Sequence, residues 1–554
     1  MKINILKSAP LAAAYPYLTL LIWLVPLLLL NNGQHSLMPQ DEAVYAVRAR
    51  WMLESGDWVT PQSWGELVYE KTPGPYWLLA AAYTLFGINE ATSRLPSLIC
   101  GILSILLTYE IAVILLNRRI AWLAAAILSV SFLWVQGSRL ATANIPMISM
   151  ALLGIWCLLK AELQPNRFYW SAAAGLSFGL GFLIRGQMIF MPMIALLPYL
   201  VWEHRRHQHL LNPMLYLGFV VGLIPTIGWF WLSYLRYGFV VFEQFFALAL
   251  RIASEQRNGN SPLFYLWNTP LKAFPWAFFS VLGLIVVLRN SHRYQLILVG
   301  CPLVILAEIS LISTRLPHYA LMLYPFMAML AAVALDWLGR IYQNKSSAQK
   351  WLPRSLSYAF GSLGCLLLLA GIIVSTGIKL PGVHLDVEVR KYGAVAIVLG
   401  LTWLTLPIIW IYRQRGKMFL TARYWLASWL LAPWLALAVA GSTGLLGNYN
   451  PDVKLFLQQP AIALALQHPV NFVVQQTQAL TTGGDKALLL LTFYTPHLGQ
   501  RFTKISDLPT ANYAWVSPEF AVDYRFRHLG TFRGWQLIQE LHKPNILSNL
   551  GMGL

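Results

Sequence analysis

The sequence predicts an all-α protein that crosses a membrane about thirteen times and ends in a small α/β domain outside the bilayer. Of its 554 residues, 57% are hydrophobic and only 11% are charged, and the mean hydropathy is +0.56. A soluble domain is usually about one quarter charged, so the composition excludes that class. Apolar runs of roughly 20 residues, long enough to span a bilayer, recur along the chain.

The predicted spans fill residues 1–446, the membrane domain. They lie near 11–31, 94–116, 120–137, 145–161, 168–185, 187–203, 213–235, 270–288, 294–312, 318–338, 356–378, 392–412 and 424–446. The first run follows two lysines and lacks a small-residue cleavage site, so we interpret it as a retained helix.

The charge pattern gives an orientation for these spans. The formal net charge is +18, but the basic residues form short clusters between apolar runs, such as Arg118-Arg119, Arg205-Arg206 and Arg413–Lys417. This distribution is typical of the positive-inside rule and not of a nucleic-acid-binding face. With the N-terminus in the cytoplasm, the loop 32–93, expected to contain interfacial helices, and the tail 447–554 both lie outside.

The tail after residue 446 differs in character from the membrane domain. Segments 471–474, 487–494 and 513–516 are short apolar runs between polar stretches, and the pattern predicts a strand for each. A small extracytoplasmic α/β domain follows from this pattern.

The first outside loop carries a dense set of polar and aromatic residues. In order, they include Asp41-Glu42-Ala-Val-Tyr45, Gly56-Asp57-Trp58, Glu70-Lys71, Phe86-Gly87 and Arg94. Adjacent acids beyond a helix end could simply form a solvated loop. The order and spacing, however, resemble the first outside loop of the protein mannosyltransferase and aminoarabinose (lipid A) transferase superfamily.

That superfamily consists of GT-C membrane glycosyltransferases dependent on dolichyl- or undecaprenyl-phosphate sugars. The resemblance implies transfer of a sugar, with inversion, to a lipid, glycan or protein acceptor on the outer face of the plasma membrane, the bacterial inner membrane. It also implies that Asp41 is the catalytic aspartate. A carboxylate can act as general base by accepting the proton of the acceptor's hydroxyl group. Glu42 is the second candidate.

Fixed cations would stabilise the departing phosphate, and arginine can grip phosphate through two parallel hydrogen bonds. Weaker resemblances along the chain contribute further candidates. The predicted phosphate-binding residues are Lys71, Arg251, Arg315 and Tyr319, and the predicted substrate-binding residues are Tyr45, Glu70, Asn144 and His318. Lys71 could instead be an interfacial anchor, and Arg185 fits a membrane anchor and a site residue equally well.

Two positions depart from the superfamily's pattern. Asn144 stands where an acid is usual, and Leu248 stands where a histidine is usual. An amide cannot accept a proton at neutral pH, so the first departure leaves an impaired enzyme or a membrane scaffold as alternatives. A carrier of lipid-linked intermediates is a third alternative, although carriers usually bind at the bilayer midplane within repeats.

No cofactor is predicted. The histidines, cysteines and carboxylates lack metal-ligand spacing, although Asp41 with Glu42 could hold a divalent cation loosely.

Overall fold

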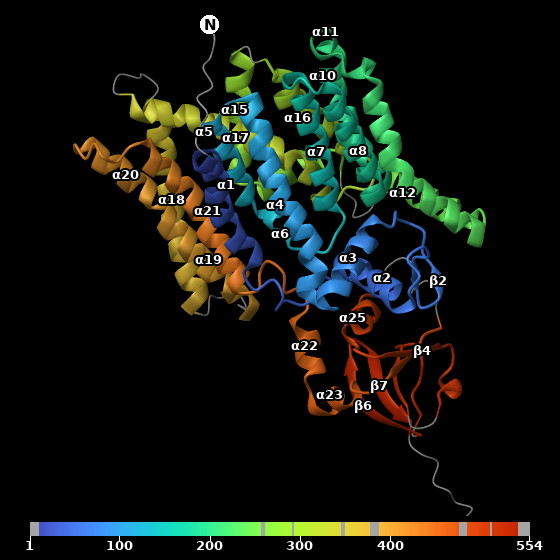
Figure 1. Cartoon of the computed structure of the whole chain (residues 1–554). Coiled ribbons are helices and arrows are strands. Elements are labelled where there is room, and N and C mark those ends of the chain that lie inside the picture. Colours follow the sequence, from blue (N-terminus) through green and yellow to red (C-terminus); the bar gives the residue numbers. More distant parts are fainter. Residues whose placement is uncertain are drawn as a thin grey trace, which may run out of the picture.

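The computed structural model describes residues 10–255, 261–290, 293–344, 350–376, 387–475, 485–509, 512–523 and 525–540. Helices predominate among the described residues before residue 470, and the strands after that point form a separate small layer (Figure 1).

Among the described residues, eight helical segments are long and apolar enough to cross a membrane, or ten if each of two bent pairs counts as one span. The single spans are α4 (Glu90–Leu115), α7 (Asn144–Leu163), α8 (Arg167–Arg185, continuing to Ala195), α12 (Pro213–Tyr237), α17 (Tyr324–Gln343, preceded by η4, Pro317–Leu323), α18 (Trp351–Thr376), α19 with α20 (Val387–Trp403, Thr405–Gln414) and α21 (Ala422–Ser442). The bent pairs are α5 with α6 (Arg118–Ser129, Phe132–Ser138) and α14 with α15 (Phe264–Lys272, Trp276–Arg289).

The count is lower than the thirteen predicted because some apolar runs form short or broken helices. The apolar parts of α1 (Pro10–Leu29) and of η3 with α16 (Leu296–Gly300, Cys301–Leu311) are shorter than 18 residues. The predicted span 187–203 is divided into η1 (Gly186–Ile189), α9 (Phe190–Ala195) and α10 (Leu197–Trp202). Proline at N1 or N2 of α10 is compatible with this break, since its ring disfavours a continuous helix.

Close glycine contacts join α8 to α12. A Cβ on Gly175 would lie 2.0 Å from the Leu215 carbonyl oxygen, and one on Gly218 would lie 2.0 Å from the Ala172 carbonyl oxygen. Small residues allow such backbone approach between membrane helices. The contact fixes α8, whose last residue, Arg185, reaches the site described below.

The first loop folds into α2 (Asp41–Ser55), a short hairpin of β1 and β2 (Gln62–Ser63, Glu66–Leu67), and α3 (Gly74–Phe86). Most of α2 is buried. The N-terminus of α3 touches the end of α8, since a Cβ on Gly74 would lie 2.5 Å from the Leu183 carbonyl oxygen.

The described part of the C-terminal region is a five-stranded mixed sheet with the short α-helices α22, α23 and α25. The strand order is β4-β3-β5-β7-β6, with β3 parallel to β4 and β5 and the other pairs antiparallel. Its elements are α22 (Pro451–Leu457), α23 (Pro460–Ala465), β3 (Val470–Val473), α25 (Lys486–Tyr494), β4 (Leu498–Phe502), β5 (Tyr513–Val516), β6 (Phe526–Phe532) and β7 (Trp535–Glu540).

The predicted strands at 471–474 and 513–516 correspond to β3 and β5. The predicted strand at 487–494 is wrong, because this segment is the buried helix α25. A short continuous apolar run fits either element by pattern. Asp485 is the N-cap of this helix and stabilises it, because its side chain accepts hydrogen bonds from the backbone N–H groups of Ala487 and Leu488 at 2.8 and 3.2 Å.

Arg50 holds this sheet region against α2. Its buried guanidinium donates to the carbonyl oxygens of Thr492, Thr495 and Pro496 at 2.8–2.9 Å. A cation at the C-terminal end of a helix also complements the helix dipole. The C-terminal sheet is therefore anchored to the same helix that begins with Asp41.

Candidate active site

A cavity of about 350 Å³ lies where the first loop meets the ends of several membrane helices. Its polar lining comes from α2, the segment before α3, the loop before α7 and the first residue of α7, the end of α8, η1, the segment before η4, and η4. These polar residues are Asp41, Tyr45, Glu70, Lys71, Thr72, Thr142, Asn144, Arg185, Gln187, Thr314, His318 and Tyr319. Six residues from the predicted site therefore share one cavity with Asp41.

Two cations line the cavity without a counter-ion among the residues described. The Lys71 ammonium lies 4.4 Å from the centre of the Tyr45 ring, and the Arg185 guanidinium lies 5.9 Å from that of Tyr319. Burial lowers the pKa of Lys71 from its ordinary value. Neither cation has an ion-pair partner within 4.0 Å among the described residues, and both are partly buried, so both positions suit an anionic ligand.

Asp41 is the first residue of α2, and its carboxylate lines the cavity without an ion pair among the described residues. Its side chain is exposed. Gln40 precedes it at φ 73° and ψ −72°, with the Asp41 N–H donating to the Pro39 carbonyl at 3.1 Å. This strained γ-turn presents Asp41 at the start of the helix.

Glu70 lines the cavity but is already paired. One carboxylate oxygen lies 3.8 Å from the Arg48 guanidinium, and the other lies 3.4 Å from that of Arg251. Arg251 belongs to the last turn of α13 (Val240–Ser254) and reaches the site through this contact, not as part of the lining.

Arg315 lies close to the cavity but outside its lining. Its guanidinium donates to the carbonyl oxygens of Ser310 at 3.1–3.2 Å and Ser313 at 3.4 Å. These carbonyls stand at the C-terminal end of α16, where a cation also complements the helix dipole. The structure thus gives Arg315 a helix-capping contact.

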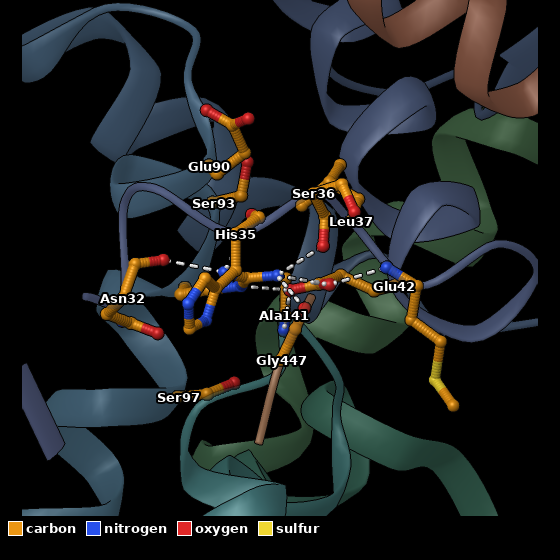
Figure 2. Close-up of polar contacts among 12 residues, drawn as sticks. Asn32, His35, Ser36, Leu37, Glu42, Glu90, Ser93, Ser97, Ala141 and Gly447 are labelled. Carbon is orange, nitrogen blue, oxygen red and sulfur yellow. Dashed lines mark hydrogen bonds and ion pairs between the residues drawn. The ribbon is translucent and has the colours of Figure 1, made fainter. Parts of the chain in front are cut away.

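Glu42 is not part of the cavity lining and belongs instead to a buried cluster (Figure 2). Its carboxylate accepts hydrogen bonds from the Arg94 guanidinium at 2.8 and 3.0 Å and from the backbone N–H groups of Met38 and Ala141 at 2.9 and 3.0 Å. Arg94 also donates to the carbonyl oxygens of Asn32, His35 and Ser36. The cluster ties α2 to α4 and to both adjoining loops.

Asn144 begins α7, and its amide nitrogen donates to the Thr142 hydroxyl at 3.2 Å. The loop 140–143 before it is anchored at Ala141 by Glu42. The positions of Asp41 and Asn144 therefore depend on the same buried carboxylate.

The sequence reasoning missed Thr72, Thr142, Gln187 and Thr314, and left Arg185 undecided. The Thr72 hydroxyl is buried and has no hydrogen-bond partner among the described residues. Its position next to Lys71 was the available signal. For Arg185, the signal is the following glycine: Gly186 has φ 56°, and a Cβ there would lie 3.2 Å from the Phe245 ring.

The remaining wall of the cavity is apolar. Its members come from the end of α8, η1, α9, α13 and the segment between α16 and η4: Ile184, Met188, Met191, Phe245, Leu248, Ala249, Ile252, Ala253, Ile312 and Leu316. The opposite face of α13 exposes Phe246 and Leu250 at 57% and 69%. Such a face suits the membrane interface, so the cavity joins a polar centre to an apolar, lipid-side wall.

Several known proteins are similar to this chain in sequence. A family model for dolichyl-phosphate-mannose-protein mannosyltransferases matches residues 70–231. A protein of Aquifex aeolicus is 27% identical over 72% of this chain and 81% of its own length. An undecaprenyl phosphate-α-4-amino-4-deoxy-L-arabinose arabinosyl transferase of Pseudomonas paraeruginosa is 28% identical over 78% of this chain and 76% of its own length.

The fold is similar to a solved structure over nearly its whole length. The crystal structure of ArnT from Cupriavidus metallidurans bound to undecaprenyl phosphate aligns with a TM-score of 0.69 at 20% identity, covering 96% of this chain and 99% of that one. In its fold, its matched segment and its relatives, the chain is similar to the GT-C membrane glycosyltransferases.

Proposed function

We propose that this protein transfers a sugar from a polyprenyl-phosphate donor to an acceptor group on the outer side of the membrane, with inversion and with Asp41 as the general base. The observation that carries the proposal is the cavity in which Asp41 faces two cations without counter-ions, beside an apolar wall. The relatives named for undecaprenyl phosphate support this donor class.

The donor's parts match the parts of the cavity. Its phosphate is an anion that Lys71 and Arg185 would neutralise, with the unpartnered Thr72 hydroxyl as a further donor. Tyr319 and, through Glu70, Arg251 stand around the same centre. The prenyl chain would lie along the wall of α13 and α9, where apolar contact replaces water.

In the reaction, the Asp41 carboxylate takes the proton of the acceptor hydroxyl as its oxygen attacks the anomeric carbon. The bond from that carbon to the phosphate oxygen breaks, and its electron pair leaves with polyprenyl phosphate. The phosphate gains one negative charge in this step, and Lys71 and Arg185 stabilise it most strongly there. A single displacement inverts the anomeric configuration.

Asn144 would act on the sugar and not on the proton. Its amide offers both a donor and an acceptor to a sugar hydroxyl, and it is held near Asp41 by the Ala141–Glu42 contact. Asp41 then remains the proton acceptor of this cavity, and the loss of the usual acid leaves the main step intact.

The two ends of α4 support the proposed side of the reaction. Its first residue, Glu90, forms an ion pair with Lys454 and accepts a hydrogen bond from Tyr494 of the C-terminal region. Its other end leads to Arg118 and Arg119, where the Arg119 guanidinium lies 3.0 Å from Asp336. The positive-inside rule assigns that basic end to the cytoplasm, and so the cavity and sheet to the outside.

The test is sugar transfer by purified protein in nanodiscs, with a panel of undecaprenyl-phosphate-linked sugars and membrane extract as acceptor. Asp41→Asn should lower the rate by about 10²–10⁴-fold, the range for loss of a general base. Glu255→Gln is the matched control, because Glu255 is an exposed acid near the same cavity that is not part of its lining. Transfer by Asp41→Asn at the normal rate would refute the mechanism.

A further inference from the structure

We propose that the transferred sugar carries no cationic amino group, and that the cavity selects a neutral, polyhydroxylated ring. This inference rests on the proposed function and narrows its substrate. It is carried by the carboxylates of the site: among the described residues that line the cavity, the acids are Asp41 and Glu70. A further ammonium group, added beside Lys71 and Arg185, would need an additional anionic partner, because desolvating an unpaired charge is costly.

Glu70 is not available as that partner. Each of its oxygens already faces a guanidinium, that of Arg48 at 3.8 Å and that of Arg251 at 3.4 Å. Arg48 is itself almost fully buried. Moving the Glu70 carboxylate towards a sugar ammonium would weaken its ion pair with this buried guanidinium. The existing pairs would therefore oppose recruitment of Glu70 by a sugar ammonium.

Asp41 is committed to a different task. A general base must be ionised and basic enough to take the acceptor's proton. An ammonium held beside it would favour the carboxylate form and reduce its tendency to accept a proton. Pairing with the sugar and accepting the proton are thus competing uses of one side chain.

The other acids near the cavity are not placed to pair with an ammonium group on the sugar. Glu42 is bound by Arg94 in the buried cluster, and Glu255 is exposed and outside the lining, with its backbone carbonyl accepting from Thr314 at 2.8 Å. Residues 256–260, which follow in the sequence, contain no aspartate or glutamate.

The overall charge around the cavity points the same way. Lys71 and Arg185 line it, and Arg48 and Arg251 stand behind Glu70. Four cations thus face two carboxylates, and a donor phosphodiester neutralises one further positive charge. A positive excess persists with the donor bound, and it would repel an added ammonium.

The neutral polar groups suit hydroxyls instead. Thr142, Asn144 and Gln187 offer hydroxyl and amide groups that can both donate and accept. The Pseudomonas paraeruginosa relative is named for an amino sugar, 4-amino-4-deoxy-L-arabinose. This chain is similar to that relative in sequence but offers no uncommitted carboxylate, among the residues described, for such an amine.

The decisive experiment compares two donors that differ in one charge. Undecaprenyl-phosphate 4-amino-4-deoxy-L-arabinose and its N-formyl derivative would be titrated at pH 7 against the full-length protein in phosphatidylcholine nanodiscs. Undecaprenyl phosphate alone is titrated in parallel. We expect the formylated donor to bind at least tenfold more tightly than the amino donor. Asn144→Asp, which adds a carboxylate to the cavity, should reduce that ratio at least tenfold, and Asn144→Gln should not.

The outcomes separate the two proposals. If undecaprenyl phosphate itself does not bind, the proposed donor class is wrong, whatever the sugar. If it binds, and the amino donor binds as tightly as the formylated one, the inference about the sugar is overturned. An unchanged ratio in Asn144→Asp would also contradict it.

Discussion

Replacing Lys71 by methionine separates a ligand-binding cation from a structural one. The Lys71 ammonium has no counter-ion among the described residues and contacts the Tyr45 ring at 4.4 Å. Methionine keeps an unbranched apolar side chain and removes the charge. If Lys71 binds the donor's phosphate, the substitution should weaken donor binding. It should also stabilise the ligand-free protein, since it removes a charge that has no ion-pair partner there.

The magnitude follows from Coulomb's law. Two unit charges 4 Å apart at an effective dielectric constant of about 20 interact by roughly 4 kcal/mol. Arg185 remains in the cavity and would take over part of this, leaving a loss of about 2–3 kcal/mol. Since 1.4 kcal/mol is a factor of ten, the Kd for undecaprenyl phosphate should rise about 30- to 150-fold. The gain in ligand-free stability should be about 1 kcal/mol, because Lys71 is only partly shielded from solvent.

Both quantities can be measured on one sample in nanodiscs, by titration with undecaprenyl phosphate and by thermal unfolding without ligand. Arg415→Met is the matched control, because Arg415 is exposed beyond the end of α20, far from α2 (Figure 1). Lys71→Arg should keep the charge. Burial lowers the pKa of Lys71, so wild-type binding should weaken as pH rises through that lowered pKa, and Lys71→Arg should resist this loss. Unchanged affinity together with lower stability in Lys71→Met would show a structural anchor and refute the reasoning.

Three further predictions concern the groups that hold the site. Glu42→Ala should lower the free energy of unfolding by about 3–5 kcal/mol, since it leaves Arg94 buried without its partner; denaturant unfolding in mixed micelles measures this, and a loss below 1 kcal/mol would contradict it. Arg50→Met should release the C-terminal sheet, seen as faster proteolysis after residue 446 while cleavage in the membrane domain is unchanged. Burial, then the charges of Arg139 and Arg94, lowers the pKa of His35 from 6.5 to about 4. The unfolded chain therefore takes up a proton first as pH falls, so stability should decline between about pH 6.5 and 4, by at most 1.4 kcal/mol per pH unit. His35→Asn should remove that part of the slope; an identical profile would contradict the assignment.

The membrane class, most helices and the polar cluster of the first loop could be predicted from sequence, because each depends on local patterns. Hydropathy locates α4, α7 and α12 regardless of their neighbours. It cannot distinguish a full span from helices broken at a kink, as between α14 and α15, which meet at 110°. Such a bend depends on packing that no sequence window contains.

The sequence also could not predict the direction in which the basic side chains point. Arg251 and Arg315 both follow apolar runs, yet one contacts Glu70 and the other caps α16. Arg185 lies at the end of a membrane helix, as an anchor would, and lines the cavity instead. Each outcome depends on which carbonyl or carboxylate the fold brings within reach, and that partner is distant in sequence.

Asp41 and Glu42 illustrate how one helix start can serve two purposes. Successive residues on an α-helix point about 100° apart, so only one of two adjacent acids at the start of α2 can face the cavity. Glu42 takes the inward direction, and its bonds to Arg94 and Ala141 N–H fix the rotation of the helix about its own axis. That rotation sets the direction of Asp41, and the Ala141 contact places Asn144 opposite. A change at Glu42 that preserves folding should therefore slow sugar transfer more than it weakens donor binding, since it displaces the base and leaves Lys71 and Arg185 in place.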